Sequence, residues 1–410
     1  MIKPVVIENK NIQLTFIGLI ASLMGIGQNG LLVSLPFLIE QSAFSLPVWS
    51  IVIAIGSFLF LPAAPFWGRF SDRNGPKIVV IQALVGMSVS FFLLWLFTVL
   101  SRHQPSLAVY CLVGLIAARI VYGCTVAGMV PASQHWAIIL CGSENRLKAI
   151  TSVSIGLSTG RLAGPLLSIL LLKVNVYAPL LIMIVFPLVA LMCSLLLPKP
   201  KPESQVFPTN HPVIASNEAI CSRWQPLFSL WPFLLSGLLL CAVIALLQYS
   251  FSPLIGSVTK WTTDKISDSI GVLLTISAAV TLLTQVLVIK KKKLDLMKMF
   301  KLGAVCLTFG FIVFLGSSIW AFPIGMAISS FGAALLVPAY TSMATQTNQG
   351  APGVTAGYIS MSHTLGYGLA SLLAVTSTLS PSYPIAICVM LSFSIVIISR
   401  LKKTIQPNAN

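Results

Sequence analysis

Long apolar runs separated by short polar segments dominate the chain. Twelve of these runs reach the roughly twenty residues that an α-helix needs to cross the hydrocarbon core of a bilayer. They lie at about residues 13–38, 48–67, 78–100, 107–130, 150–172, 178–197, 230–252, 268–289, 299–317, 320–342, 354–377 and 383–399. The pattern predicts an all-α polytopic membrane protein with twelve transmembrane helices.

Composition excludes a soluble globular protein. Of 410 residues, 56% are hydrophobic and only 8% are charged, whereas about a quarter of the residues of an average soluble domain are charged. The first apolar run is too long for the core of a signal peptide, and no small-residue cleavage site follows it. We therefore expect the first run to remain as a span.

The positive charges predict the orientation. With the N-terminus inside, nineteen of the 25 Lys and Arg fall in cytoplasmic segments, four fall on the opposite face, and Arg119 and Arg161 lie inside spans. Because cytoplasmic loops carry an excess of Lys and Arg, we expect both termini to be cytoplasmic. The net charge of +16 is spread over short loops, so we expect no nucleic-acid partner.

A proline-rich polar stretch near the middle divides the chain. We predict a six-helix half at residues 1–197, a cytoplasmic linker at 198–229 and a second six-helix half at 230–410. A weak internal repeat supports two related halves. The Val-Pro-Ala triplet at Val130 recurs at Val337, an offset of 207 residues, and Gly164 corresponds to Gly368 at an offset of 204.

A charged turn separates the second and third spans. It reads Gly-Arg-Phe-Ser-Asp-Arg-Asn-Gly-Pro-Lys-Ile-Val-Val from Gly68 to Val80. Gly75 followed by Pro76 is expected to end the turn and start the next helix, because proline suits the first helical position. Asp72 is the only acid here, and it can pair with its basic neighbours or with a helix N-terminus.

This turn resembles the loop between spans 2 and 3 of the major facilitator superfamily, Gly-x-x-x-Asp-Arg/Lys-x-Gly-x-Arg/Lys. The matching positions are Gly68, Asp72, Arg73, Gly75 and Lys77; the final basic position is Ile78. The resemblance implies two six-helix halves that rock around a central pathway, with Asp72 and its basic neighbours holding the cytoplasmic side closed in the outward-facing state.

Span 4 contains a charged residue at membrane depth. Its sequence from Leu115 to Gly123 places Arg119 at the centre, one helical turn before Gly123. The segment resembles the Leu-x-x-x-Arg-x-x-Gln-Gly pattern of proton-linked facilitators, with Tyr122 in place of glutamine. The resemblance implies that Arg119 takes part in proton coupling or substrate binding. The alternative is an arginine tied to backbone groups of the helix bundle.

Span 5 carries glycines four residues apart followed by proline. Gly156, Gly160 and Gly164 line one face, which lets another helix approach closely, and Pro165 bends the span. The run resembles the glycine motif of the twelve-span drug:proton antiporter branch, although Ser168 and Ile169 replace its closing glycines.

Arg119 and Arg161 are intramembrane cations with no acid in the middle of any span. Such a locally positive cavity favours an anion, and guanidinium groups bind carboxylates in a bidentate fork. A carboxylate-bearing metabolite such as a siderophore would fit this chemistry. The alternative is that Arg161 faces the cytoplasmic end of its span and serves packing.

Other polar groups are candidates for the pathway. Gln28 and Asn29 lie in the middle of span 1, where amide side chains contact substrate or join helices. His363 in span 11 is the leading candidate for a proton site, because histidine exchanges a proton near neutral pH. His135 at the end of span 4 is expected at the surface. The eight cysteines show no metal-ligand spacing.

These features predict a secondary transporter rather than an enzyme. No phosphate loop or catalytic constellation is found, and we expect no cofactor and no metal. The prediction is proton-coupled efflux of a small organic solute, an anionic metabolite or a drug, by a monomer in the bacterial cytoplasmic membrane. Its partners would be the solute, protons and the lipid bilayer. The alternatives are uptake of an organic anion and a non-transporting receptor or scaffold of the same fold.

Overall fold

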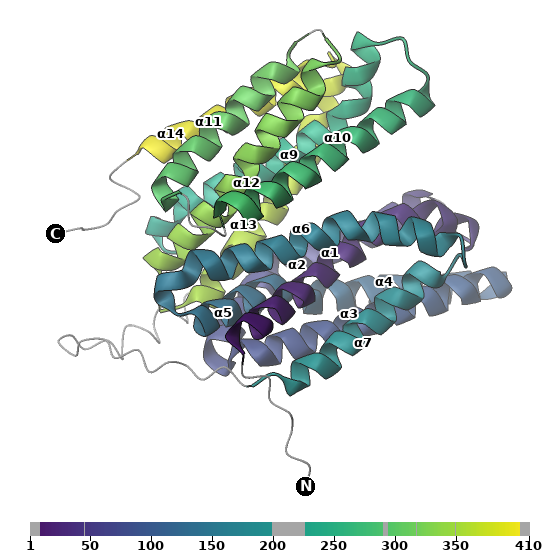
Figure 1. The fold of residues 1–410 in the computed structure, drawn as a ribbon. Coiled ribbons are helices and arrows are strands. Elements are labelled where there is room, and N and C mark those ends of the chain that lie inside the picture. The colour runs from purple at the N-terminus through teal and green to yellow at the C-terminus, as the bar shows by residue number, and fades with distance from the viewer. Residues whose placement is uncertain are drawn as a thin grey trace. The chain divides into compact units, whose positions relative to one another are not determined.

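The computed structural model describes residues 9–44, 46–198, 226–289, 294–316, 318–348 and 350–401. All regular structure in these ranges is helical (Figure 1). The chain divides into two compact units, one formed by Met1–Arg223 with Gly350–Ser360 and the other by Trp224–Gln349 with Met361–Asn410. Residues 199–225 of the predicted linker lie outside the described residues, and the predicted domain boundaries stay a prediction.

The described residues of the first unit form seven α-helices and the beginning of another. Their bounds are α1 (Lys10–Glu40), α2 (Leu46–Asn74), α3 (Pro76–His103), α4 (Ala108–Val126), α5 (Met129–Cys141), α6 (Arg146–Leu172), α7 (Ala178–Leu196) and the start of α13 (Pro352–Leu373). Helix α3 packs against α4, α5 and α7, and α1 packs along α6. Trp49, Phe91 and Trp136 are fully buried in this unit.

The second unit contains α9 (Trp231–Val258), α10 (Thr263–Thr284), α11 (Leu296–Phe314), α12 (Ala321–Thr347), the rest of α13, and α14 (Tyr383–Arg400). A π-helical turn, Gln285–Ile289, extends α10. Helix α11 packs against both α12 and α14. Asp295 caps α11, since its side chain accepts a hydrogen bond from the Met297 amide at 3.3 Å.

The twelve predicted spans are confirmed as helices. Eleven stretches of the described chain are long and apolar enough to cross a membrane. Helix α13 is the remaining span, and its 22 residues extend about 33 Å at the rise of an α-helix. The structure adds one break, because span 4 ends at Val126 and a separate helix, α5, continues from Met129 to Cys141.

The charged turn between spans 2 and 3 is shorter than predicted. Helix α2 continues to Asn74 and α3 starts at Pro76, so that only Gly75 lies between them. Its φ of +92° is a left-handed conformation that glycine adopts without strain. The sequence from Gly68 to Asn74 is therefore the last two turns of α2, and its side chains lie on a helix surface.

Glycines bring α1 and α6 into backbone contact. A Cβ at Gly156 would lie 2.0 Å from the Gly18 carbonyl oxygen, and one at Gly160 would lie 2.0 Å from the Ser22 carbonyl oxygen. A Cβ at Gly164 would lie 3.0 Å from the Ile26 Cα. The contacts repeat every four residues on α6, with Pro165 inside the helix directly after them. No other residue fits this face without separating the helices.

We predict that Gly160→Ala destabilises the protein. The added methyl meets backbone atoms of α1 that cannot rotate away, and overpacking of this kind costs about 1–3 kcal/mol. Thermal unfolding of the detergent-solubilised protein measures the effect. The matched control is Gly271→Ala in α10, where nothing lies within 4 Å of the added Cβ and helix propensity favours alanine. Equal melting temperatures for the two variants would contradict the packing argument.

Candidate functional site at the junction of α2 and α13

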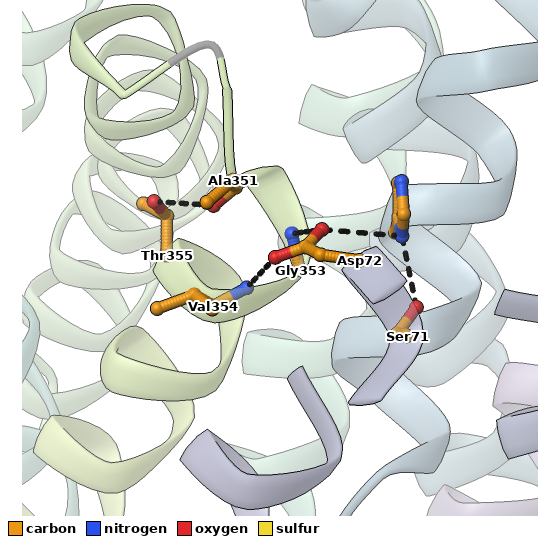
Figure 2. Close-up of polar contacts among 7 residues, drawn as sticks. Ser71, Asp72, Ala351, Gly353, Val354 and Thr355 are labelled. Atoms are coloured by element: carbon orange, nitrogen blue, oxygen red, sulfur yellow. Dashed lines mark hydrogen bonds and ion pairs between the residues drawn. The ribbon is translucent and has the colours of Figure 1, made fainter. Parts of the chain in front are cut away.

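The last turn of α2 lies against the first turn of α13, within the first unit. Asp72 accepts hydrogen bonds from the backbone amides of Gly353 at 2.8 Å and Val354 at 2.7 Å. Figure 2 shows the carboxylate facing the open end of the helix, with one oxygen on each amide. The Asp72 side chain is 3% exposed. The sequence offered Asp72 two partners, its basic neighbours or a helix N-terminus, and the structure shows it at a helix N-terminus.

This contact satisfies two donors that α13 cannot satisfy itself. The first four amides of an α-helix have no partner within the helix, and the N-terminus carries a partial positive charge that favours an anion. An aspartate from a different helix thus acts as the cap of α13. Hydrogen bonds to a charged group contribute about 1.5–3 kcal/mol each.

Small residues let the two helices meet at this place. A Cβ at Gly68 would lie 2.3 Å from the Gly353 carbonyl oxygen, and one at Gly357 would lie 2.6 Å from the Ala64 carbonyl oxygen. Positions 64 and 68 on α2 thus face positions 357 and 353 on α13 in antiparallel order. Sequence analysis missed Gly353 and Gly357, although their spacing of four residues is the signal that identified the glycines of α6.

Arg69 adds a second polar contact between α2 and α13. Its Nη2 donates to the Tyr358 hydroxyl at 2.5 Å, and its guanidinium lies 5.4 Å from the centre of the Tyr358 ring. Arg69 is buried, whereas the sequence suggested only a charge that orients the loop. Tyr358 was not predicted either, because nothing in the sequence places span 11 beside the end of span 2.

His135 lies inside this site, and its predicted surface position is wrong. It is 7% exposed, and its Nδ1 lies 2.8 Å from Ser71 Oγ and 3.5 Å from Asp72 Oδ1. The break before α5 explains the difference, since it lets α5 pack against α2, α3 and α6 as a separate helix. A proton on Nδ1 would face both oxygens and would support the Asp72 carboxylate.

The basic residues of the motif have different surroundings. Lys77 in the first turn of α3 donates to the Leu195 carbonyl at 3.2 Å and also to the Leu197 carbonyl, at the C-terminal end of α7. A cation is favourable there because helix C-termini carry partial negative charge. Arg73 is exposed on the last turn of α2. The roles proposed for these residues in gating stay a prediction.

Arg119 lies buried in the first unit between α2 and α4. It is 5% exposed, and its guanidinium lies 4.4 Å from the centre of the Tyr122 ring. A Cβ at Gly56 would meet its Nε at 3.0 Å, and a Cβ at Gly123 would meet the Gly56 carbonyl oxygen at 2.5 Å. Gly56 and Gly123 thus bring α2 and α4 together beside the guanidinium.

This arginine has no carboxylate partner among the described residues. Its Nε has no hydrogen-bond acceptor, and no carboxylate in the described part of the chain forms an ion pair with it. The Gln28 side chain approaches the Tyr122 hydroxyl. Buried cations are normally paired, which makes Arg119 the candidate for binding an anion.

The other candidates from the sequence are placed as follows. Asn29 Nδ2 donates to the Arg161 backbone carbonyl at 2.9 Å, which ties α1 to α6 directly beside their glycine contacts. The Arg161 side chain is exposed on α6. No described contact joins Arg161 to Arg119, and a shared cavity between these two arginines stays a prediction. His363 in α13 belongs to the second unit, where it contacts Tyr340 of α12.

Together these features define a polytopic helical membrane protein whose candidate functional groups lie between spans. The model of the Major Facilitator Superfamily matches residues 17–371. The chain belongs to this family, and the resemblance drawn from the Gly68–Lys77 motif is confirmed. Its apolar helices and its bacterial relatives identify a multi-pass protein of the bacterial inner membrane.

Relatives with assigned roles match parts of the chain. The Staphyloferrin B transporter of Staphylococcus aureus is 29% identical over 127 residues, 31% of this chain and 27% of the relative. Multidrug resistance protein 1 of Bacillus subtilis is 27% identical over 203 residues, 48% of this chain and 49% of the relative. The matches therefore span less than half of either relative.

Solved structures share the fold over nearly the whole chain. The major facilitator transporter FucP in its outward conformation gives a TM-score of 0.74 at 13% identity, covering 96% of this chain and 99% of that chain. The human organic anion transporter MFSD10 gives 0.71 at 18% identity, covering 95% and 99%. At these identities the likeness establishes the fold and nothing about the solute.

We predict that Asp72→Asn lowers solute flux without reducing insertion into the membrane. Asparagine offers one acceptor oxygen and turns an NH₂ donor toward a backbone amide, so the cap loses one charge-assisted bond and its charge. Each such bond contributes about 1.5–3 kcal/mol. Flux into inverted vesicles, normalised to the inserted protein, measures the effect.

The matched control is Asp295→Asn. Asp295 caps its own helix by accepting from the Met297 amide, and asparagine is an equally good N-cap residue. This variant should transport like the wild type. Wild-type flux in Asp72→Asn would show that transport does not depend on the carboxylate at α13.

Proposed function

We propose that the protein is a secondary active exporter that moves a carboxylate-bearing organic solute out of the cell by alternating access, driven by protons moving inward. The single observation that carries the proposal is Arg119, a buried guanidinium without a carboxylate partner among the described residues. The export direction and the proton coupling are parts of the proposal.

The electrostatics of Arg119 favour an anionic solute. Inserting a charged side chain at membrane depth costs roughly 2.5–3.5 kcal/mol on insertion scales. A ligand that brings a negative charge to such a side chain would offset part of this cost. A carboxylate can take two parallel hydrogen bonds from a guanidinium. The Tyr122 ring, 4.4 Å from the guanidinium carbon, adds a cation–π contact that holds the fork in place.

Neighbouring amide groups would complete the site. Gln28 lies near the Tyr122 hydroxyl, and Asn29 is held by the Arg161 carbonyl at 2.9 Å. Both come from the middle of α1, and Gln28 would offer an amide donor and acceptor beside the Tyr122–Arg119 pair of α4. A solute with several carboxylates and hydroxyls matches these groups better than a lipophilic cation, which Arg119 would repel.

The contact between Asp72 and α13 would serve as the latch of the transport cycle. Helix α13 begins in the first unit and continues in the second, so capping by Asp72 ties a helix of the second sequence half to α2. Breaking two hydrogen bonds and the Arg69–Tyr358 contact would release that helix. An energy of a few kcal/mol suits a latch that must both hold and open.

Two further observations support export. The glycine contacts of α6 with α1 involve the residues that resemble the glycine motif of drug:proton antiporters, Gly156, Gly160 and Gly164. Relatives that match parts of the chain are named for siderophore transport and for multidrug resistance. Because some relatives are named for multidrug resistance, export of lipophilic drugs is the competing function. The charge of the exported solute distinguishes carboxylate export from drug export.

The deciding experiment profiles solutes in cells with and without the protein. Small organic acids and chelators, staphyloferrin B among them, are quantified in the medium and in the cytoplasm, together with lipophilic cationic dyes. We expect a carboxylate-rich compound to be lost from the medium and to accumulate inside when the protein is absent. Depletion of the cytoplasm would instead indicate uptake, and a change in dyes alone would indicate a multidrug pump.

We predict that Arg119→Gln lowers export of the carboxylate at least tenfold. Removing one partner of a buried charge pair costs about 2–5 kcal/mol, and Arg119→Lys should lose less because it keeps the charge but not the planar fork. Arg161→Ala in the same assay tests whether the second arginine contributes. The control is Arg102→Gln, because Arg102 is exposed at the end of α3. Unchanged carboxylate export in Arg119→Gln would refute the proposed site.

A further inference from the structure

The break in span 4 interrupts the hydrogen bonds of the helix. Ala127 and Gly128 lie between the end of α4 and the start of α5. Because Pro131 has no amide hydrogen, the Ala127 carbonyl loses the donor that a continuous helix would supply. The Gly128 amide donates to the Thr125 carbonyl at 3.4 Å, whereas in a continuous helix it would donate to Cys124, four residues earlier. Carbonyl groups at the end of α4 thus need donors from elsewhere.

Trp67 of α2 supplies such a donor. Its indole Nε1 donates to the Cys124 carbonyl at 2.5 Å and so replaces the Gly128 amide. The stem of the same side chain occupies the space beside Gly128, since a Cβ at that glycine would lie 2.8 Å from the Trp67 Cβ and 2.9 Å from its Cγ. One tryptophan therefore contacts both the last turn of α4 and the residue directly before α5.

Neighbouring side chains fix the orientation of the indole. The Trp67 ring meets Phe66 and Phe70 edge to face, with ring centres 5.2 and 5.4 Å apart, a favourable arrangement for aromatic pairs. On the other side of the break, a Cβ at Gly128 would lie 2.7 Å from Cγ1 of the buried Val79 in α3. Side chains of α2 and α3 thus enclose the break and leave no room for a side chain at position 128.

The segment of α2 that holds the break also carries the latch residues. One turn after Trp67, Ser71 Oγ lies 2.8 Å from Nδ1 of His135 in α5, and Asp72 Oδ1 lies 3.5 Å from the same nitrogen. The start of α5 therefore depends on Trp67, and its middle meets Asp72 through His135. Because a helix transmits displacement as a rigid element, the position of His135 follows from the angle at which α5 leaves the break.

The opposite side of the break is fixed to α2 by separate contacts. A Cβ at Gly123 would lie 2.5 Å from the Gly56 carbonyl oxygen, and a Cβ at Gly56 would lie 3.0 Å from Arg119 Nε. These contacts do not involve the indole. A change at Trp67 should therefore leave Arg119 in place and act on α5.

We propose that Trp67 is a positioning residue of transport, whose indole holds the break in span 4 so that α5 keeps His135 against Asp72. The proposal rests on the proposed function, since it concerns the latch of the transport cycle. It assigns Trp67 a role in the strength of the latch and none in solute binding. The indole N–H is the essential group, because phenylalanine would fill much of the same space without donating to Cys124.

Amide hydrogen exchange tests the proposal without any solute. Trp67→Phe should speed exchange of a peptide covering residues 350–356 roughly two- to tenfold, the factor that corresponds to one neutral hydrogen bond, because a displaced His135 supports the Asp72 carboxylate less. Peptides from α3 should exchange as in the wild type. Unchanged exchange of the 350–356 peptide, or faster exchange throughout the protein with α3 included, would overturn the proposal.

The matched control is Trp49→Phe. Trp49 also belongs to α2, and its indole donates to Ser42 Oγ at 3.0 Å, near the opposite end of that helix from Trp67. Trp49→Phe removes the same kind of hydrogen bond and should leave the 350–356 peptide at its wild-type rate. Equal acceleration of this peptide in both variants would show that any lost indole bond in α2 has the same effect, which contradicts a specific role of Trp67.

Transport kinetics separate positioning from solute binding. In proteoliposomes with staphyloferrin B as the probe, Trp67→Phe should lower the maximal rate, as Asp72→Asn does. The half-saturating concentration should stay within about twofold of the wild type, well under the effect of one lost hydrogen bond to a charged group, because Arg119 is held by other contacts. A raised half-saturating concentration, or an unchanged maximal rate, would overturn the proposal and leave the exporter standing.

The proposed function fails by a different result. A wild-type protein that moves neither staphyloferrin B nor any profiled carboxylate would end the proposed export. The exchange rates of the 350–356 peptide in Trp67→Phe and Trp49→Phe would then decide alone whether the Trp67 indole positions α5.

Discussion

The open N-terminus of α13 is the constraint on which the rest of the site depends. A helix that begins among other helices carries donors that water cannot reach, and a carboxylate from outside must supply the acceptors. Asp72 does so with bonds of 2.7 and 2.8 Å. The close approach of Gly68 to Gly353, the Arg69–Tyr358 contact and the burial of His135 all follow from holding α2 in that position.

Helix α13 carries two of the groups discussed here. Its first turn receives the Asp72 carboxylate, and His363 lies ten residues further along, about 15 Å at 1.5 Å per residue. A displacement that frees the first turn must also move the imidazole or bend the helix between them. Because α13 begins in the first unit and continues in the second, release of its first turn by Asp72 would act on a helix that both units share.

Much of the fold could be predicted because a bilayer permits few solutions. Runs of about twenty apolar residues have to become helices, and the Gly68–Lys77 motif identified the family. Local chemistry was also readable, as Gly75 and Pro76 mark the end of α2 and the start of α3. Contacts between segments that are distant in the sequence could not be predicted. Tyr358, Gly353 and His135 join Asp72 only through packing, and Val126 ends span 4 early, which no periodicity revealed.

The most direct test of the account is amide hydrogen exchange at the start of α13. The amides of Gly353 and Val354 have no acceptor within their own helix, so their protection reports on the Asp72 carboxylate. We expect a peptide covering residues 350–356 to exchange slowly in the wild type and much faster in Asp72→Asn, with peptides from α3 unchanged. Equal exchange of that peptide in both proteins would show that Asp72 does not hold the helix, and the proposed latch would have to be abandoned.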